Sequence, residues 1–252
     1  MKSTTTYLDN IAIVLHRPRF PENIGAAARA ACNMGLWRLI LVDPVNCDLT
    51  RILRMATHAA AEVVEKMDVY PDLAAALSSF SYVVGTTARV GGQRRELRTP
   101  RKMAAELVPI CRHNEVAIVF GPEDRGLTNA DLRFCHALVT IPTSGFSSLN
   151  LAQAVMIISY ELLLAGRTEV SEFVPRLANR QELDAMYDHL EETFIKIGFI
   201  NPENPDHWMQ NIRRFFSRVG LRARDVKVIR GICRQIDWYT QRRLEAMERR
   251  QK

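Results

Sequence analysis

Three segments of this 252-residue chain hold small, charged and polar residues in spacings that suit ligand binding. In the first, 21–29, a loop enters an alanine-rich helix that carries a single arginine. In the second, 119–128, an apolar run ends in a charged loop bracketed by Gly121 and Gly126, which allow backbone amides to approach a ligand. In the third, 141–151, a polar loop leads into a long apolar helix. Each segment taken alone is also consistent with a turn followed by a helix cap.

Several kinds of chemistry are disfavoured by what the chain lacks. It has neither G-x-G-x-x-G nor G-x-x-x-x-G-K-[ST], so neither the usual dinucleotide fold nor a P-loop is supported. A serine hydrolase built on Ser147 or Ser148 is disfavoured, because the segment 145–149 lacks the second glycine of a nucleophile elbow. The cysteines show no C-x-x-C pair and no zinc-like histidine spacing, so we expect reduced, structural thiols and no metal. They are Cys32, Cys47, Cys111, Cys135 and Cys233.

The elements that must position the three segments are predicted from hydrophobic periodicity. Five short apolar runs are predicted strands, and helical stretches alternate with them. This alternation predicts an α/β fold, a parallel sheet with helices on both faces and ligand sites at the carboxyl ends of the strands. The predicted strands are 11–16, 39–42, 81–85, 116–120 and 137–141, and the helices between them are 23–34, 54–67, 72–79, 101–111 and 129–134.

The remainder of the chain predicts a second, smaller domain. A long apolar helix, 149–165, is followed by Gly166, a favourable residue just past a helix end, so we expect the catalytic domain to span 1–166. Mixed charge and one proline predict a linker at 167–180. The segment 181–252 is predicted to form a small all-α domain.

Charge is unevenly distributed along the chain. The net charge is +6, but the segment 207–252 holds 13 Lys and Arg against 4 Asp and Glu, a local +9. A basic segment attached to a mildly acidic body indicates either a polyanion-binding appendage or a solvated helix surface. In this domain Ile212, Phe215, Phe216 and Val219 recur at helical spacing and are expected to face a small core.

Three further aromatic residues of this domain allow two interpretations. Trp208, Trp238 and Tyr239 could stack on bases, but in a small helical domain we expect them in the core. No apolar run reaches the length that spans a bilayer, and the first ten residues lack a hydrophobic stretch after their lysine, so we expect a cytoplasmic protein with no membrane partner.

Taken together, the three segments resemble a known family. N-I-G-x-x-x-R, F-G-x-E-x-x-G-L and I-P-x-x-x-x-S-S-L-N-L-A occur here in order, and the set is similar to the three motifs of the SPOUT methyltransferases, in particular the TrmH-like branch. The segments 187–193, 198–200 and 211–216 resemble the C-terminal domain of the TrmJ-type tRNA methyltransferases, which methylate the ribose of cytidine or uridine at position 32 of the anticodon loop.

The resemblance implies a fold and a cofactor. SPOUT enzymes have a deep trefoil knot near the end of the catalytic domain, an exception to the rule that chains do not thread loops. They bind S-adenosylmethionine in the knot, with the adenine read by backbone groups of turns. The residues implied to bind it here are Thr86, Thr87, Ala88, Gly121, Ile141, Ser147, Ser148 and Leu149.

The resemblance also implies catalytic residues, and Arg29 matches the arginine usually given that role. Because a guanidinium stays protonated at ordinary pH, we expect Arg29 to hold a phosphate and stabilise the developing alkoxide rather than act as a base. The implied site is completed by Asn23, Glu123, Ser148 and Asn150.

The resemblance also implies tRNA contact by Arg89 and a mode of assembly. The charge count of the basic domain adds Arg213, Arg214 and Arg218 as expected tRNA contacts. The family works as homodimers with the active site at the protomer interface, so a homodimer is expected. Two alternatives remain open: methylation of ribosomal RNA, and an RNA-binding protein of this fold that has lost methyl transfer.

Overall fold

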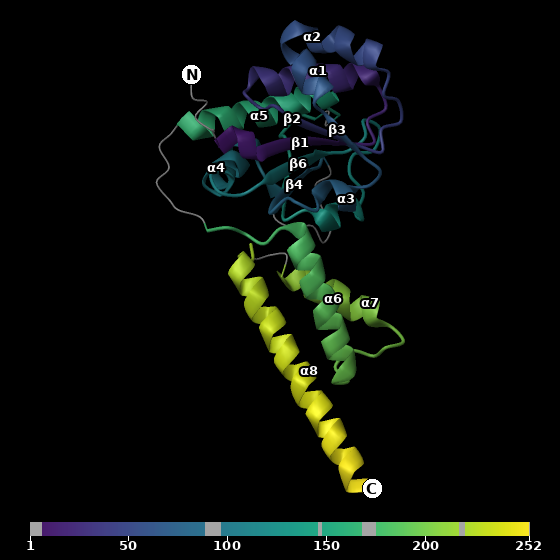
Figure 1. Ribbon diagram of the computed structural model, residues 1–252. Helices are drawn as coiled ribbons and strands as arrows, with labels where there is room; N and C mark the ends of the chain where they lie inside the picture. Colours follow the sequence, from purple (N-terminus) through teal and green to yellow (C-terminus); the bar gives the residue numbers. More distant parts are fainter. Residues whose placement is uncertain (1–6, 89–96, 146–147, 168–174, 217–219, 252) are drawn as a thin grey trace. The chain divides into compact units, whose positions relative to one another are not determined.

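The computed structural model describes residues 7–88, 97–145, 148–167, 175–216 and 220–251. The chain divides into two compact units, Met1–Pro175 and Arg176–Lys252. The boundary between them in the sequence falls inside the predicted linker. Figure 1 shows the sheet and its helices in the first unit and the helices α6, α7 and α8 in the second.

The first unit is built on a parallel sheet. Its strand order is β3-β2-β1-β6-β4-β7-β5, and every pairing in it is parallel. The strands are β1 (Ile11–His16), β2 (Arg38–Val42), β3 (Asp68–Tyr70), β4 (Tyr82–Thr86), β5 (Leu97–Arg98), β6 (Val116–Phe120) and β7 (Ala137–Val139).

Helices cover both faces of this sheet, as the alternation of elements predicts (Figure 1). Residues of β1 alternate between two cores: Ile11, Ile13 and Leu15 pack with one set of helices, and Ala12 and Val14 pack on the opposite side. The first face is covered by α1 (Pro21–Asn33), α4 (Pro100–Cys111) and α5 (Leu151–Arg167), with α2 (Leu49–Glu65) packed on α1. The second is covered by α3 (Leu73–Leu77) and the 3-10 turn η2 (Asp131–Phe134).

Strand β7 lies between β4 and β5, although it follows both in the sequence. The later chain therefore enters the sheet between two strands that are themselves joined through residues 87–96. Such an insertion is a requirement of the expected trefoil knot. The threading itself stays a prediction, because residues 89–96 lie outside the described part of the chain.

Several predicted boundaries were wrong. The edge strands β3 and β5 were not predicted, and the expected helix at 129–134 is the short turn η2. Helix α2 begins at Leu49, five residues before the predicted start, because the Asp48 side chain accepts a hydrogen bond from the Arg51 amide at 3.2 Å.

Gly166 was expected just past the end of the long helix, but it lies inside α5. A Cβ at this position would meet the Tyr7 ring at 2.0 Å, and the Tyr7 hydroxyl donates to the Leu162 carbonyl at 3.0 Å. The glycine therefore provides room for the 3-10 turn η1 (Tyr7–Asn10) against α5, a packing role that a capping argument does not reveal.

The second unit consists of α6 (Arg180–Lys196), α7 (Pro205–Phe216) and α8 (Ala223–Gln251). Helix α6 begins with a full capping box between Asn179 and Glu182. The core of the second unit is formed by one face of each helix, and Ile212 and Phe216 pack against this core as expected. The expectation for Phe215 was wrong, since that ring is 65% exposed, and Val219 lies outside the described residues.

The other aromatic residues of the second unit also differ from expectation. Trp208, Trp238 and Tyr239 are 46%, 51% and 55% exposed, so the prediction that they form core was wrong. The physical reason is that each helix buries a single stripe in this small domain, and these rings lie outside it.

Candidate active site

Three neighbouring strands end at the same edge of the sheet, and the predicted site residues follow them. The order β6-β4-β7 places the segments after Phe120, Thr86 and Val139 side by side. The roots of these loops are bonded to one another: Thr86 Oγ1 donates to the Val119 carbonyl at 3.1 Å, and the Thr87 amide donates to the Val139 carbonyl at 2.9 Å. A ligand at this edge would therefore meet a fixed backbone frame.

The loop after β6 is held tightly at its glycine. A Cβ on Gly121 would meet the Leu127 amide nitrogen at 2.3 Å and the Gly126 carbonyl carbon at 2.4 Å, so no side chain fits there without a backbone shift. The loop then closes on a capping interaction: Asp131 accepts hydrogen bonds from the Thr128 amide at 2.7 Å and from the Thr128 hydroxyl at 2.8 Å.

One chain of hydrogen bonds connects all three sequence motifs. Asn23 of α1 donates through Nδ2 to Glu123 Oε1 at 2.8 Å, and Asn150 donates through Nδ2 to Asn23 Oδ1 at 3.0 Å. Asn150 also caps α5, because its Oδ1 accepts from the Ala152 amide at 2.9 Å. Three of the five predicted catalytic residues are thus connected by bonds that span 100 and 127 residues of sequence.

Arg19 completes this chain and was not predicted. Its amide donates to Glu123 Oε2 at 3.0 Å, and its guanidinium donates to Asp124 at 2.8 Å. Both carboxylate oxygens of Glu123 are therefore occupied by donors. The signal that could have found Arg19 is its position in the basic run 17–19, immediately before the first motif.

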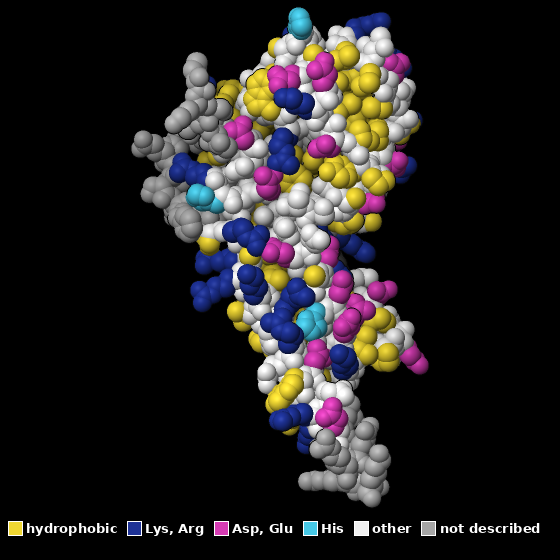
Figure 2. Space-filling model, in the orientation of Figure 1, with side chains coloured by type: hydrophobic (Ala, Val, Ile, Leu, Met, Phe, Trp, Pro, Cys, Tyr) yellow, Lys and Arg dark blue, Asp and Glu magenta, His cyan; other side chains and the backbone are white. Residues whose placement is uncertain are grey.

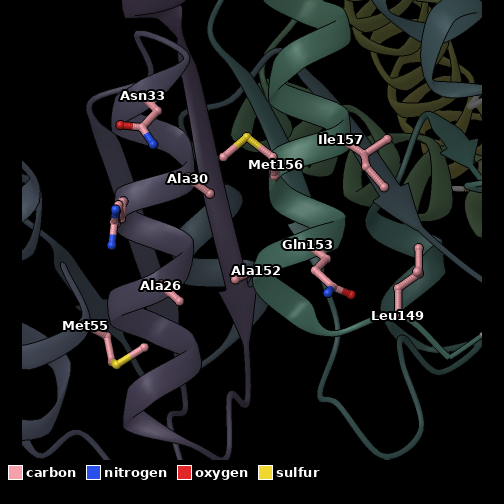
Figure 3. Close-up of a pocket in the computed structure, with 10 residues that line it drawn as sticks. Ala26, Ala30, Asn33, Met55, Leu149, Ala152, Gln153, Met156 and Ile157 are labelled. Atoms are coloured by element: carbon pink, nitrogen blue, oxygen red, sulfur yellow. The ribbon is translucent and has the colours of Figure 1, made fainter.

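Arg29 lies on the exposed side of α1 and forms no hydrogen bond or ion pair with any described residue. It lines a hollow of about 590 Å³ between α1 and α5, together with Met55 of α2 and Leu149, which was predicted to bind the cofactor. Figure 3 shows the labelled side chains of α1 and α5 on the two sides of this hollow. The remaining lining residues are mostly apolar: Ala26, Ala30, Asn33, Ala152, Gln153, Met156 and Ile157.

Two titratable groups near this edge are perturbed. A hydrogen bond from Arg51, at 2.8 Å, lowers the pKa of Glu22 at the start of α1. Burial lowers the pKa of His16 at the end of β1, although Asp131 at 3.4 Å opposes that shift. Both shifts stabilise the forms expected at neutral pH, a charged Glu22 and a neutral His16.

The other predicted cofactor residues lie around the same edge. Ala88 and Ser148 are exposed, while Ile141 and Leu149 are half-buried. Ser147 and Arg89 fall outside the described residues, as does Arg218 in the second unit.

The predicted RNA-binding arginines of α7 are placed differently from one another. Arg213 lies 3.5 Å from Asp184 and 3.7 Å from Asp188, and its guanidinium stacks 4.7 Å from the Tyr187 ring centroid. Its contacts therefore connect α7 to α6. Arg214 is exposed.

Neither thiols nor metals are indicated as reactive groups in the described part of the chain. All five cysteines are free, and burial raises the pKa of Cys111 and Cys233, which disfavours their thiolates. The described residues contain no cluster of His, Cys, Asp or Glu that could hold a metal ion. Within the same ranges, no helix is long and apolar enough to cross a membrane.

Comparison with protein families gives a match for each unit. The profile of the SpoU rRNA methylase family matches residues 10–160, and that of the tRNA methyltransferase TrmJ C-terminal domain matches residues 181–250. Among curated proteins, the tRNA (cytidine/uridine/adenosine-2'-O-)-methyltransferase TrmJ of Pseudomonas aeruginosa is 38% identical over 239 residues, covering 89% of this chain and 93% of the relative.

Solved structures give the same result. The crystal structure of TrmJ from Z. mobilis ZM4 matches with a TM-score of 0.75 at 32% identity, covering 90% of this chain and 98% of that one. A structure described as giving insights into the 2-OH methylation of C/U34 on tRNA matches with a TM-score of 0.50 at 28% identity. It covers 62% of this chain but 97% of its own length.

Proposed function

This chain belongs to the SpoU methylase family and carries a TrmJ C-terminal domain, and we propose that it transfers a methyl group from S-adenosylmethionine to a ribose 2'-hydroxyl of tRNA, at cytidine or uridine 32 of the anticodon loop. The observation that carries this proposal is the hydrogen-bonded series Glu123–Asn23–Asn150 at the carboxyl edge of the sheet. It fixes three motif side chains beside the loops that would hold the cofactor.

The residues at this edge suit a nucleoside cofactor. The segments 86–88, 121 and 141–149 follow three adjacent strands, and Gly121 allows the loop after β6 to close tightly on the Leu127 amide. Exposed backbone groups and the Ser148 hydroxyl provide hydrogen-bonding partners for it. When bound there, S-adenosylmethionine supplies an activated methyl group on its sulfonium.

In the proposed mechanism Arg29 acts on the RNA. Its guanidinium forms no bond with a described residue, so it is available to hold the phosphate beside the reacting ribose and to stabilise the alkoxide as the 2'-oxygen loses its proton. It cannot accept that proton, because a guanidinium remains charged at ordinary pH. The proton passes to water or to a phosphate oxygen.

Asn23, Glu123 and Asn150 act by position. Since Glu123 accepts from Asn23 and from the Arg19 amide, the Asn23 side chain is held in one orientation. Asn150 links this arrangement to the start of α5. A rigid frame of this kind favours in-line approach of the 2'-hydroxyl to the methyl group, which contributes much of the acceleration in transfer reactions.

Assembly as a homodimer is part of the proposal. The hollow that contains Arg29 is lined mainly by apolar side chains of α1 and α5, and a second protomer over it would cover them. A cytoplasmic location is also part of the proposal, because tRNA is the proposed substrate.

The C-terminal domain favours nucleotide 32 over nucleotide 34. The structure that concerns C/U34 aligns over 97% of its own length but with only 62% of this chain, so that protein has no counterpart of the second unit. TrmJ from Z. mobilis covers 90% of the chain and therefore includes it. The same domain favours tRNA over ribosomal RNA as substrate.

The test is methyl transfer to defined RNAs. The purified chain, given S-adenosylmethionine and unmodified tRNA transcripts, should produce one 2'-O-methyl group, located at nucleotide 32 by mass spectrometry of nuclease fragments. A transcript with a 2'-deoxy nucleotide at position 32 is the matched control and should accept no methyl group. Methylation at 34, methylation of ribosomal RNA alone, or cofactor binding without transfer would each contradict the proposal.

A further inference from the structure

Helix α8 presents aromatic and aliphatic side chains that no other described element covers. Val228, Ile232 and Tyr239 are each 55% exposed and recur at spacings of four and seven residues, so they lie along one stripe of the helix. Trp238 is 51% exposed and lies beside this stripe. The opposite side of α8 is buried through Val226 and Cys233 in the core of the second unit.

Arginines are stacked on both rings. The Arg242 guanidinium lies 4.7 Å from the Trp238 ring centroid, and the Arg243 guanidinium lies 5.7 Å from that of Tyr239. Each pair is separated by four residues, one helical turn, so the arginines continue the aromatic surface along the helix. Figure 2 shows Lys and Arg side chains interleaved with hydrophobic ones over the segment that Figure 1 labels α8.

Six cations of α8 form no ion pair within the described part of the chain. No ion pair joins Arg242 or Arg243 to a described residue, and the same holds for Arg224, Lys227, Arg230 and Arg234. Three acids of the helix have other described partners: Asp225 accepts from the Arg222 amide at 2.9 Å, Asp237 binds His189 and Lys196, each at 3.0 Å, and Glu245 accepts from the Gln241 side chain at 3.4 Å. This surface therefore combines exposed rings with two arginines that form no ion pair with a described residue.

A second copy of α8 fits this surface poorly. Two helices that pair along such a stripe need opposite charges beside it, but here arginines would face arginines. An unpaired nucleic acid fits well, because phosphates neutralise the arginines and bases stack on the rings.

We propose that the α8 surface formed by Trp238, Tyr239, Arg242 and Arg243 binds unpaired nucleotides of the RNA substrate, by base stacking on the two rings and phosphate contact to the two arginines. The inference deepens the proposed tRNA activity and rests on it. It assigns RNA contact to α8, whereas the sequence motifs had directed attention to the arginines of α7.

The two kinds of contact are separable by salt. Trp238→Leu/Tyr239→Leu keeps apolar bulk and removes stacking, so tRNA affinity should fall about 5- to 100-fold with the salt dependence unchanged. Arg242→Gln/Arg243→Gln should weaken binding and also lower the slope of log affinity against log salt by roughly 1 to 2, since phosphate contacts are lost. Filter binding of a full tRNA transcript at several salt concentrations measures both quantities.

Matched variants complete the experiment. Trp238→Phe/Tyr239→Phe should bind tRNA nearly as well as the wild type, because the rings remain. Lys66→Gln/Arg112→Gln removes two charges at the ends of α2 and α4 in the first unit, and should leave the slope unchanged. Circular dichroism and calorimetry with S-adenosylmethionine verify folding and cofactor binding in every variant.

Three results would overturn the assignment: a leucine variant with wild-type tRNA affinity, an arginine variant with the slope of the Lys66/Arg112 control, or phenylalanine variants as weak as the leucine ones. If the α8 surface instead contacted another protein chain, the variants would show altered assembly in sedimentation experiments and an unchanged tRNA affinity per dimer. Failure of the proposed function looks different: wild-type chain leaves tRNA unmethylated, while the variants still differ in RNA affinity.

Discussion

The edge of the sheet and the surface of α8 use polar side chains in opposite ways. At the edge, Glu123 and Asn150 are each bonded to Asn23, and Arg29 alone among the motif residues described there has its charge free. On α8, Arg242 and Arg243 form no ion pair with a described residue, and the rings beside them are half-exposed. The first arrangement suits a reaction that requires fixed geometry, and the second suits a polyanion that must bind and leave.

The largest effect is expected at Arg29, which forms no ion pair with a described residue. Arg29→Ala should lower the rate of methyl transfer about 100- to 1000-fold, the cost of losing one donor that stabilises developing charge. Affinity for S-adenosylmethionine should stay near the wild-type value, because the role proposed for Arg29 is toward the RNA. Single-turnover kinetics and calorimetry measure the two quantities, with Asn33→Ala in the same hollow as the control. A variant that retains most of its turnover contradicts this role.

Removal of the second unit should separate affinity from catalytic geometry. A protein truncated after Pro175, where the first compact unit ends, should retain cofactor binding. All the hydrogen-bonded motif residues, the last of which is Asn150, lie before this position. The tRNA affinity of the truncated protein should fall, and its salt slope should become shallower by about 0.7–0.9 per lost phosphate contact. Equal slopes in truncated and full-length protein, at equal dimer content by sedimentation, would show that the second unit does not bind RNA.

Disruption of the hydrogen bonds among Glu123, Asn23 and Asn150 should have an intermediate effect on the rate of methyl transfer. Glu123→Ala leaves the Asn23 amide and the Arg19 amide without their acceptor, and hydrogen bonds to a charged group are worth about 1.5–3 kcal/mol each. We expect about a 10- to 100-fold lower transfer rate with unchanged tRNA affinity. Glu123→Gln, which keeps one acceptor oxygen, should lose less. An unchanged transfer rate in Glu123→Ala would mean that these hydrogen bonds do not position the reacting groups.

Two glycines of the same loop provide a matched pair for stability. Gly121→Ala places a Cβ 2.3 Å from the Leu127 amide, so the loop must shift, and we expect at least about 1–3 kcal/mol of destabilisation. Gly126→Ala meets nothing within 4 Å and should cost about 1 kcal/mol, from its positive φ of 63° alone. Thermal unfolding with and without S-adenosylmethionine gives both values. Equal costs would show that close approach at Gly121 is relieved easily.

The smallest effect is expected at Arg213, which distinguishes α7 from α8. Its contacts with Asp184, Asp188 and Tyr187 are partly exposed, so Arg213→Gln should reduce stability by only about 0.5–1 kcal/mol. Because this charge is already compensated, the salt slope of tRNA binding should hardly change. If Arg213→Gln lowered the slope of log affinity against log salt by about 0.7–0.9, the value of one phosphate contact, Arg213 would be an RNA-binding residue after all.

The sequence predicted the centre of the fold better than its edges. Strands β1 and β6 have the predicted bounds because they are continuous apolar runs, buried on both faces. Strands β3 and β5 have three and two residues, with exposed or half-exposed side chains, so they lack a pattern that periodicity could detect. The start of α2 was placed too late because the cap at Asp48, which sets that start, was not recognised in the sequence.

The site was predicted as a set of residues, not as a network. The parallel-sheet rule places the three motifs at one edge, but the bonds of Asn23 to Glu123 and Asn150 depend on side-chain directions that no spacing specifies. Arg19 was missed because its decisive contact uses its backbone amide. The exposure of Trp238 was missed because hydrophobic type does not say which face of a helix packs.

The place of β7 between β4 and β5 has a consequence for synthesis on the ribosome. Residues 99–136 separate Arg98, the last residue of β5, from Ala137, the first of β7. At about 5–20 residues per second, the chain waits roughly 2–8 s before the missing strand is made. During that interval β4 exposes an unpaired edge to other nascent chains. The two-residue β5, with its arginine, is a poor template for wrong pairing, so its brevity protects the sheet until the strand arrives.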